Sequence, residues 1–457
     1  MNTFLKESAG ANPKAAVAEA HTLRSPHIST YRRRRAQLAR RIKGGIVIIP
    51  TAPEATRNAD THYGYRFDSH FYYLSGFREP EAVIVIVAGK KPRSILFCRE
   101  KNPEREIWDG YRYGPEDARV AFGFDEAYPI AALGEKIPEM LGNRPSLHTP
   151  LGLHAGWDRR VVGWLNAVRS QSRSGVAAPA VIVDVREAIS EQRVIKDAQE
   201  IAVMRRAAAI SAEAHKCAMR ATRPGATEYE IEAELLYEFK RNGSQAPAYG
   251  SIVAGGANAC VLHYVENSAA LNDGDLLLID AGCELDGYAS DITRTFPVNG
   301  KFSGAQKEVY ELVLESQLAA IKAVKPAAPF VAYHEVAVLA LAQGMIDLKL
   351  CKGSLNKVIE TADYRRFYMH RTGHWLGLDV HDAGAYMKDG KWRKLEPGMV
   401  LTVEPGMYIR PADNVPKAFW NIGVRIEDDV LVTKKGRDVI TEAAPKKVAD
   451  IEALMRG

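Results

Sequence analysis

Residues 276–295 read LLLIDAGCELDGYASDITRT and predict a β-hairpin. The apolar run Leu276–Ile279 is typical of a buried strand, and Asp286-Gly287 is a dipeptide that favours a two-residue type I′ turn. With the turn at that dipeptide, Leu285 lies opposite Tyr288 on the partner strand. The segment therefore predicts not only two strands but also their register.

That register brings two aspartates together. Counting back from the turn, Gly282 lies opposite Asp291, and Asp280 is the diagonal neighbour of Asp291 on the same face. Two carboxylates at the end of an apolar strand repel each other unless a cation or a shared proton compensates, and a divalent metal ion is the natural remedy. Taken alone, the pair fits equally well an Asp280 that ends a strand and an Asp291 on a wet surface, because aspartate is common beside turns.

Two later segments repeat this arrangement of a carboxylate beside an apolar strand. In residues 400–406, VLTVEPG, Glu404 follows such a strand. In residues 421–429, NIGVRIEDD, the spacing predicts Arg425 and Glu427 on one face of another strand. The repetition favours a shared site over isolated surface carboxylates.

A histidine-rich segment supplies a nitrogen donor. Residues 369–381 read MHRTGHWLGLDVH, in which His370 and His374 have the i, i+4 spacing of a helical zinc pair. The glycines of the segment disfavour a helix, so His374 alone is predicted to be a ligand. The alternative for His370 and His381 is a hydrogen-bonded structural histidine.

The candidate metal ligands are thus four carboxylates and one imidazole. They are Asp280, Asp291, His374, Glu404 and Glu427. This set suits a pair of divalent ions such as Mn²⁺, Co²⁺ or Zn²⁺, and its richness in oxygen leans toward Mn²⁺.

The rest of the chain predicts two domains behind a short extension. Residues 1–30 are expected to be loose, residues 31–193 to form an α/β domain, and residues 194–457 to form an α+β catalytic domain with helices covering an antiparallel sheet. The first helix is predicted at Tyr31–Arg41, with the arginine run Arg32–Arg35 as a solvated face.

The composition sets limits on location and partners. The chain has 457 residues and a formal net charge of +5, so a nucleic-acid partner is not expected. Its five cysteines form no CxxC pair, which favours buried thiols in a reducing compartment. No run reaches the ~20 apolar residues of a membrane span, and no secretory signal is evident. The expected location is the cytoplasm, with organellar import still open.

Several motifs then resemble one family. The segments IDAG (279–282), DITRT (291–295), HWLGLDVH (374–381), VEPG (403–406) and RIEDD (425–429) resemble those of the pita-bread metallopeptidases, in particular bacterial-type aminopeptidase P. Further similar segments are TRNAD (56–60), FYYLSGFREP (71–80) and CVLHYVEN (260–267). The likeness extends over the chain from about residue 31, and Arg371-Thr-Gly373 departs from the familiar bacterial pattern.

The resemblance implies a pita-bread fold, two metal ions bridged by Asp291 and Glu427, and removal of the N-terminal residue from peptides with proline in second place. A metal-bridging hydroxide is expected to attack the carbonyl carbon, with Glu404 accepting its proton and His263 or His381 stabilising the tetrahedral intermediate. The residues expected to line the substrate site are His263, His370, His381, Arg425 and Tyr408. Arg425 is equally well suited to holding a carboxylate ligand in place.

The resemblance also points to the first domain and to oligomers. Asp60 and Trp108 match positions implicated in closing the active site, in some members from a neighbouring subunit, so a dimer or tetramer is expected. The simpler alternatives are that Asp60 caps a turn and that Trp108 packs in a core or interface.

Four rival functions remain. Prolidase shares the fold and the metals but accepts only dipeptides, and methionine aminopeptidase does not need the large first domain. A metal-free enzyme resembling creatinase would have lost ligands. A non-catalytic protein that binds RNA through its arginine-rich arm would bind in a strongly salt-dependent manner.

Overall fold

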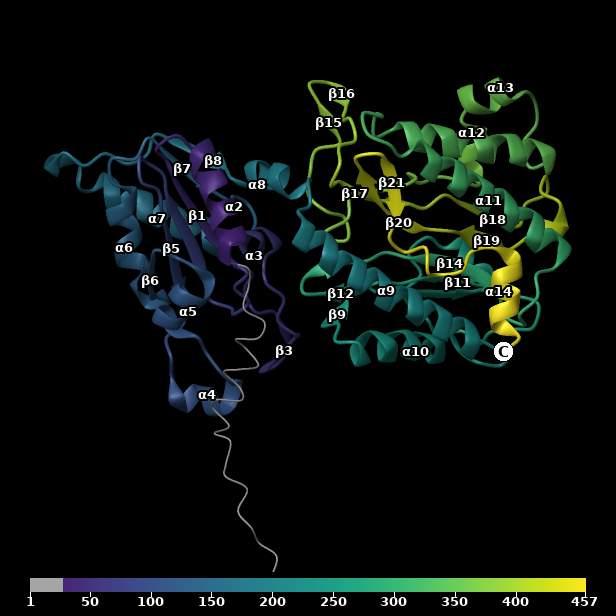
Figure 1. Ribbon diagram of the computed structural model, residues 1–457, viewed down its shortest axis with the longest axis horizontal. Helices are drawn as coiled ribbons and strands as arrows, with labels where there is room; N and C mark the ends of the chain where they lie inside the picture. The colour runs from purple at the N-terminus through teal and green to yellow at the C-terminus, as the bar shows by residue number, and fades with distance from the viewer. Residues whose placement is uncertain (1–27) are drawn as a thin grey trace, which may run out of the picture. The chain divides into compact units, whose positions relative to one another are not determined.

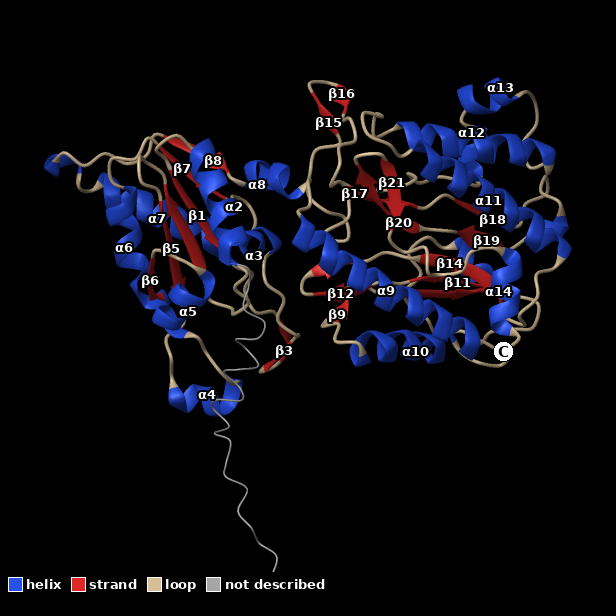
Figure 2. Ribbon diagram, in the orientation of Figure 1, coloured by secondary structure: helices blue, strands red, loops and turns tan. Residues whose placement is uncertain are grey.

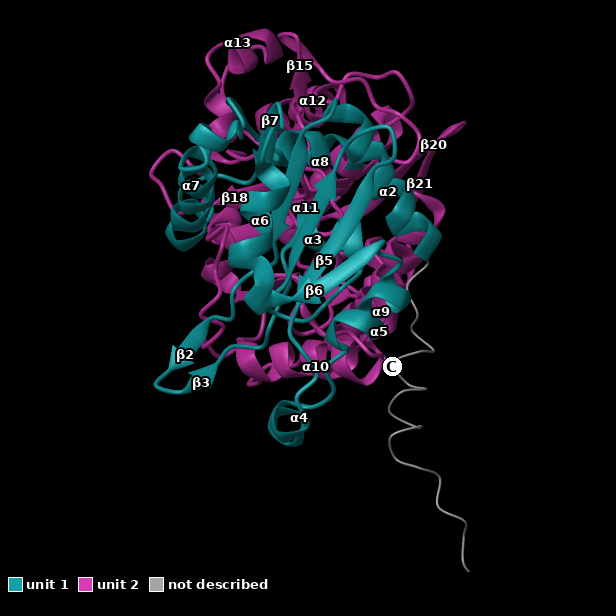
Figure 3. Cartoon of the chain, turned by 90° about the vertical axis from the view of Figure 1, so that its left-hand side faces the viewer, with its two compact units in different colours: residues 1–192 teal, residues 193–457 magenta. Residues whose placement is uncertain are grey.

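The computed structural model describes residues 28–457, and the chain divides into two compact units, one ending at Gln192 and one beginning at Arg193 (Figure 3). Most of the predicted loose extension lies outside the described residues. The first described helix, α2 (Ile28–Arg41), begins three residues before the predicted start.

The N-terminal unit is an α/β domain built on a six-stranded sheet of order β6-β5-β4-β1-β7-β8. The strands are β1 (Ile46–Pro50), β4 (Val83–Val87), β5 (Arg93–Cys98), β6 (Glu126–Pro129), β7 (Ser146–Thr149) and β8 (Val181–Asp184). A separate hairpin contains β2 (Thr56–Asn58) and β3 (Thr61–His62). Its other helices are α3 (Ser69–Ser75), α4 (Pro103–Asp109), α5 (Gly114–Phe122), α6 (Leu133–Leu141), α7 (Ala155–Arg169) and α8 (Arg186–Arg193). Helices cover both faces of the sheet (Figure 2).

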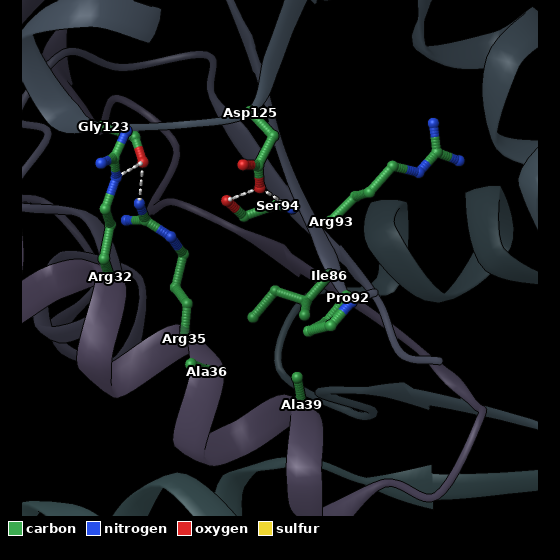
Figure 4. A pocket seen from close by; sticks show the side chains of 10 residues that line it. All are labelled: Arg32, Arg35, Ala36, Ala39, Ile86, Pro92, Arg93, Ser94, Gly123 and Asp125. Carbon is green, nitrogen blue, oxygen red and sulfur yellow. Dashed lines mark hydrogen bonds between the residues drawn. The ribbon is translucent and has the colours of Figure 1, made fainter. Parts of the chain in front are cut away.

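The arginine run of α2 is not a solvated face, and that prediction is wrong at two positions. Arg34 and Arg35 are 4% and 2% exposed. Arg35 donates to the carbonyl oxygens of Leu74 and Phe122 at 2.8 and 3.2 Å, so its guanidinium satisfies carbonyl groups at helix ends. Arg35 also borders a cavity of about 180 Å³ between α2 and the sheet, across which Asp125 accepts hydrogen bonds from Ser94 (Figure 4).

The C-terminal unit is an α+β domain in which two pairs of helices enclose the strands. The helices α9 (Ala198–Ala221) and α10 (Glu228–Arg241) cover one side, and α11 (Gly304–Ala323) and α12 (Ala332–Asp347) cover the other (Figure 1). The smaller helices are α13 (Leu355–Glu360) and α14 (Val448–Met455). Apolar side chains from the helices and from the strands between them form one large core.

The strands of this unit form several short antiparallel ladders. They are β9 (Ala246–Pro247), β10 (Ile252–Gly255), β11 (Leu276–Asp280), β12 (Cys283–Leu285), β13 (Tyr288–Ala289), β14 (Thr293–Pro297), β15 (Met387–Lys388), β16 (Lys391–Trp392), β17 (Val400–Val403), β18 (Gly406–Ile409), β19 (Ile422–Arg425), β20 (Asp428–Thr433) and β21 (Gly436–Val439). Among the described residues, no helix is both long enough and apolar enough to cross a membrane.

The predicted hairpin forms with its predicted register. Leu285 pairs with Tyr288 across the turn, and Asp280 pairs with Thr293 further along, so Gly282 lies opposite Asp291. The ladder is interrupted between these pairs. A Cβ atom at position 282 would lie 1.8 Å from a backbone oxygen of the facing strand, so only glycine fits there.

A second interrupted hairpin carries the other two carboxylates. Val403 pairs with Asp428 and Gly406 pairs with Arg425, so Glu404 lies opposite Glu427 in the gap between two ladders. The expectation that Glu427 shares a strand with Arg425 is therefore wrong, because β19 ends at Arg425. Asp291, Glu404 and Glu427 thus lie in the gaps of the two hairpins, and Asp280 lies at the edge of the first gap.

Candidate active site

The two interrupted hairpins meet at a cavity of about 750 Å³. All of the residues that line it belong to the C-terminal unit. They include every candidate ligand, namely Asp280, Asp291, His374, Glu404 and Glu427. Groups from distant parts of the chain therefore converge on one site.

His374 lies at the centre of this group. Its Nε2 atom is 3.4 Å from Asp291 Oδ2 and 3.5 Å from Glu404 Oε1. Potential ligand atoms of Asp291, His374 and Glu427 all lie within 4.8 Å of one another. The ligand atoms of these side chains are therefore close enough together to bind a common metal ion.

Hydrogen bonding orients the imidazole of His374 as a metal ligand needs. Its Nδ1 atom donates to the carbonyl oxygen of Trp375 at 2.9 Å, which leaves Nε2 facing the carboxylates as the atom that would bind a metal ion in place of a proton. Burial lowers the pKa of His374, but the neighbouring Asp291 and Glu404 outweigh burial and raise that pKa to about 9. The imidazole thus lies in a strongly negative environment.

Among the described residues, the cations near the carboxylates compensate only part of their charge. Burial raises the pKa of Glu404 to about 7, with Asp291 and Asp280 contributing further repulsion. Burial and the other site carboxylates raise the pKa of Glu427 well above its ordinary value, and burial also raises that of Asp291. A buried, mostly oxygen donor set with this excess of negative charge fits divalent cations.

Arg425 partly offsets this charge and connects several groups. Its guanidinium contacts Asp280 Oδ2 at 2.6 Å, Tyr408 Oη at 2.9 Å and Thr293 Oγ1 at 3.1 Å. The Thr293 hydroxyl donates to Glu427 Oε2 at 2.6 Å. Of the two roles expected for Arg425, the geometry favours that of holding a carboxylate in place.

His370 is held in a definite tautomer next to this network. Its Nδ1 atom donates to the carbonyl oxygen of Arg371 at 2.7 Å, so its Nε2 atom accepts from the Tyr408 hydroxyl at 2.9 Å. Burial and the nearby Arg425 lower the pKa of His370 to about 3, so the ring is neutral. Tyr408 is 1% exposed and fixed between His370 and Arg425.

The remaining predicted residues lie in different places. His263 and His381 line the cavity and are exposed, and the ring centroids of His381 and His374 are 4.3 Å apart. Asp60 lies in the exposed turn between β2 and β3, and Trp108 lies in α4 with 83% of its surface exposed. Both belong to the N-terminal unit, and their roles stay predictions.

Sequence reasoning missed a tyrosine at the centre of the site. The Tyr249 hydroxyl donates a hydrogen bond that Asp280 Oδ1 accepts at 2.6 Å, and it also contacts Asp291 Oδ1. In the sequence, the only clue is that Tyr249 shortly precedes the residues of β10. The structure pairs Ile252 of β10 with Asp280, which brings Tyr249 near the site.

An apolar wall on one side of the cavity was also missed. It is made by the aromatic residues Phe330, Tyr386 and Trp392, together with Met387. No periodic pattern marks these residues, because they come from a loop before α12 and from the β15–β16 hairpin.

Comparison with known proteins settles the family. Residues 202–434 match the model of metallopeptidase family M24, and residues 31–148 match that of the aminopeptidase P N-terminal domain. The chain belongs to the aminopeptidase P family of M24 metallopeptidases. It is 44% identical to a Xaa-Pro aminopeptidase of Escherichia coli (strain K12) over 93% of this chain and 96% of that protein.

Solved structures of the family have the same fold. The aminopeptidase PepP of Pseudomonas aeruginosa is 50% identical, with a TM-score of 0.92 over 94% of this chain and 98% of that one. In sequence, the chain is also 46% identical to the Xaa-Pro aminopeptidase of Haemophilus influenzae, over 88% of this chain and 91% of that protein. The predicted family, pita-bread fold and metal-dependent peptidase activity are therefore confirmed, and the rival of a non-catalytic protein is set aside.

Proposed function

We propose that this aminopeptidase P family member removes the N-terminal residue from peptides with proline in second place. We further propose that Asp280, Asp291, His374, Glu404 and Glu427 hold two divalent ions for this reaction. The observation that carries the proposal is the convergence of these five side chains on one cavity, with the Nε2 atom of His374 directed at two of the carboxylates. The Xaa-Pro aminopeptidase relatives support the choice of substrate.

Manganese is the ion we propose, with cobalt and zinc as alternatives. Four of the five donors are carboxylates, and oxygen donors suit Mn²⁺ better than they suit softer ions. When bound, paired divalent ions make a water molecule more acidic and polarise a carbonyl group. The protein itself must hold the ions, orient the substrate and accept the proton that the water molecule loses.

Glu404 is the residue we assign to proton transfer. Its Oε1 atom accepts a hydrogen bond from Thr402 at 3.2 Å, and its backbone N–H donates to the carbonyl oxygen of Thr372 at 2.8 Å. These contacts fix the carboxylate at the edge of the cavity. In that position it can accept the proton of the attacking water.

The histidines supply contacts to the substrate. His263 and His381 are exposed to the cavity, where an imidazole N–H can donate to the developing oxyanion. Proline offers no amide N–H, so the site must recognise the shape of its ring and the adjacent carbonyl group. His370, held neutral between Tyr408 and Arg371, presents a fixed ring surface for that purpose.

The proposal extends to the assembly and the compartment. Trp108 and Ile107 expose 83% and 82% of their surfaces in α4, and large apolar side chains exposed together are typical of interaction surfaces. We therefore propose a homo-oligomer, which light scattering of the purified protein tests. The five free thiols suit the cytoplasm or another reducing compartment.

The first test removes the proposed base. Glu404→Ala is expected to lower kcat/KM for a Xaa-Pro-Yaa peptide by about 10³-fold or more, since the variant loses both a ligand and a proton acceptor. The matched control is Glu396→Ala, which removes an exposed carboxylate from the same segment. Circular dichroism should show an unchanged fold in both variants. Wild-type rates in Glu404→Ala would refute the assignment.

The same assay separates this function from its nearest rival. Metal-free protein is supplied in turn with Mn²⁺, Co²⁺ or Zn²⁺ and offered Xaa-Pro, Xaa-Pro-Yaa and Xaa-Ala-Yaa peptides. Cleavage of Xaa-Pro-Yaa alone supports the proposal, whereas cleavage of Xaa-Pro alone identifies a prolidase.

A further inference from the structure

Two arginines line the cavity, and they differ in their partners. Arg425 is paired with Asp280 at 2.6 Å. Among the described residues, the guanidinium of Arg371 contacts no carboxylate and lies over the ring of Trp392. The guanidinium carbon lies 5.5 Å from the centroid of that ring. The charge of Arg371 is therefore available to a ligand.

The backbone that carries Arg371 is fixed on both sides. Its carbonyl oxygen accepts the hydrogen bond from His370 Nδ1. The next residue, Thr372, is fully buried, and its hydroxyl contacts His334 and Tyr368 at 2.8 and 2.5 Å. The exposed side chain of Arg371 thus projects from a rigid base directly beside the candidate metal ligands.

The aromatic partner is also held in place. Trp392 pairs with Met387 across the β15–β16 hairpin, and its ring stacks on Phe330 with centroids 6.5 Å apart. A guanidinium that lies against an aromatic face keeps its N–H groups free at the edge. Those N–H groups match the two oxygens of a carboxylate.

We propose that Arg371 and Trp392 form a subsite for a carboxylate group of the peptide on the carboxyl side of its proline. This inference rests on the proposed function, and it names a preferred class of substrate. The positive charge of Arg371 repels the ammonium group at the N-terminus of a peptide and attracts a carboxylate at its other end. The anionic end of the peptide therefore lies toward Arg371.

The carboxylate has two sources, the free C-terminus of a tripeptide and an acidic side chain in third position. Four peptides distinguish them: Ala-Pro-Ala with a free or an amidated C-terminus, and amidated Ala-Pro-Asp and Ala-Pro-Asn. The wild type is expected to favour the charged member of at least one pair by about tenfold in kcat/KM, the size expected of one charge-assisted contact. The preference should reside mainly in KM, because the contact is remote from the scissile bond.

Three variants test the role of the arginine. Arg371→Ala should reduce the preference to about one, Arg371→Lys should retain part of it, and Arg371→Glu should reverse it. The control is Arg365→Ala, an exposed arginine that does not line the cavity. Added salt should weaken the preference in the wild type and should have no such effect in Arg371→Ala.

The outcomes separate the two proposals. A wild type that cleaves the charged and neutral peptides at equal rates, or an Arg371→Ala variant that keeps the full preference, overturns the subsite while leaving the proposed function intact. A metal-loaded wild type that cleaves none of the four peptides overturns the proposed function itself.

Discussion

Glu427 and Asp428 are adjacent in the chain and almost completely buried, yet their surroundings are opposite. Asp428 contacts Arg294 at 2.8 Å and also Lys446, and these cations outweigh burial and hold its pKa well below the ordinary value. No cation of residues 28–457 forms an ion pair with Glu427, and burial together with Asp291 raises its pKa well above the ordinary value. The chain thus neutralises a structural carboxylate with its own side chains and leaves the charge at the site for external ions.

A second structural cluster follows the same rule. Asp382 lies one residue after His381 and is fully paired with Arg193 and with Lys196, the latter at 2.8 Å. Although burial favours the neutral acid, these two cations lower its pKa to about 2. The loop that carries His374 and His381 is therefore anchored by charges that need no metal.

The largest expected effect is the difference in stability between variants of Asp428 and of Glu427. Asp428→Asn leaves the buried Arg294 without its counter-charge, which is expected to lower the free energy of unfolding of metal-free protein by about 3–5 kcal/mol. Glu427→Gln replaces a carboxyl group whose charged form is disfavoured by burial and by the neighbouring carboxylates, so it should not lower that free energy. Urea denaturation of the metal-free variants measures both.

The stabilisation by added metal should also differ between the two variants. Added Mn²⁺ should stabilise the wild type and Asp428→Asn, because ligands that bind only the folded state add to its stability, and should stabilise Glu427→Gln much less. A Glu427→Gln variant that is destabilised as strongly as Asp428→Asn would contradict the comparison.

The sequence predicted the carboxylates better than it predicted their surroundings. The turn at Asp286-Gly287 fixes the register of the first hairpin, so the proximity of Asp280 and Asp291 follows from local chemistry. The opposition of Glu404 and Glu427 depends on a pairing that two ladders impose together, and the sequence offers no turn dipeptide to mark it.

Burial of charged side chains was predicted least well. Arg35 looks like any surface arginine, but carbonyl groups at distant helix ends draw it into the N-terminal unit. Arg371 shows the opposite case, since nothing in its neighbours along the chain reveals that Trp392 lies beneath it. In both cases the decisive partner is far away in sequence, so no local pattern records it.

A smaller effect concerns the pH dependence of the anchored loop. The pKa of Asp382 is lowered from 3.8 to about 2 on folding, so its contribution to stability is present above about pH 4 and is lost as the pH falls through about 2. That contribution is about 2 kcal/mol. Asp382→Asn should abolish this part of the acid dependence, as measured by urea denaturation between pH 4 and pH 2. An unchanged acid profile would mean that the ion pairs do not hold the loop.

The smallest expected effect concerns Tyr249, which contacts two carboxylates of the candidate site. This phenol donates to Asp280 and contacts Asp291, so it orients two proposed ligands without carrying a charge of its own. Tyr249→Phe keeps the ring but loses these contacts, and the affinity for Mn²⁺ should fall about tenfold, as for other groups that orient metal ligands. Isothermal titration with Mn²⁺ measures this fall, and activity at saturating Mn²⁺ should recover most of its wild-type value. If the affinity is unchanged, the two aspartates are oriented by Arg425 and by the hairpin alone, and the tyrosine is only a neighbour of the site.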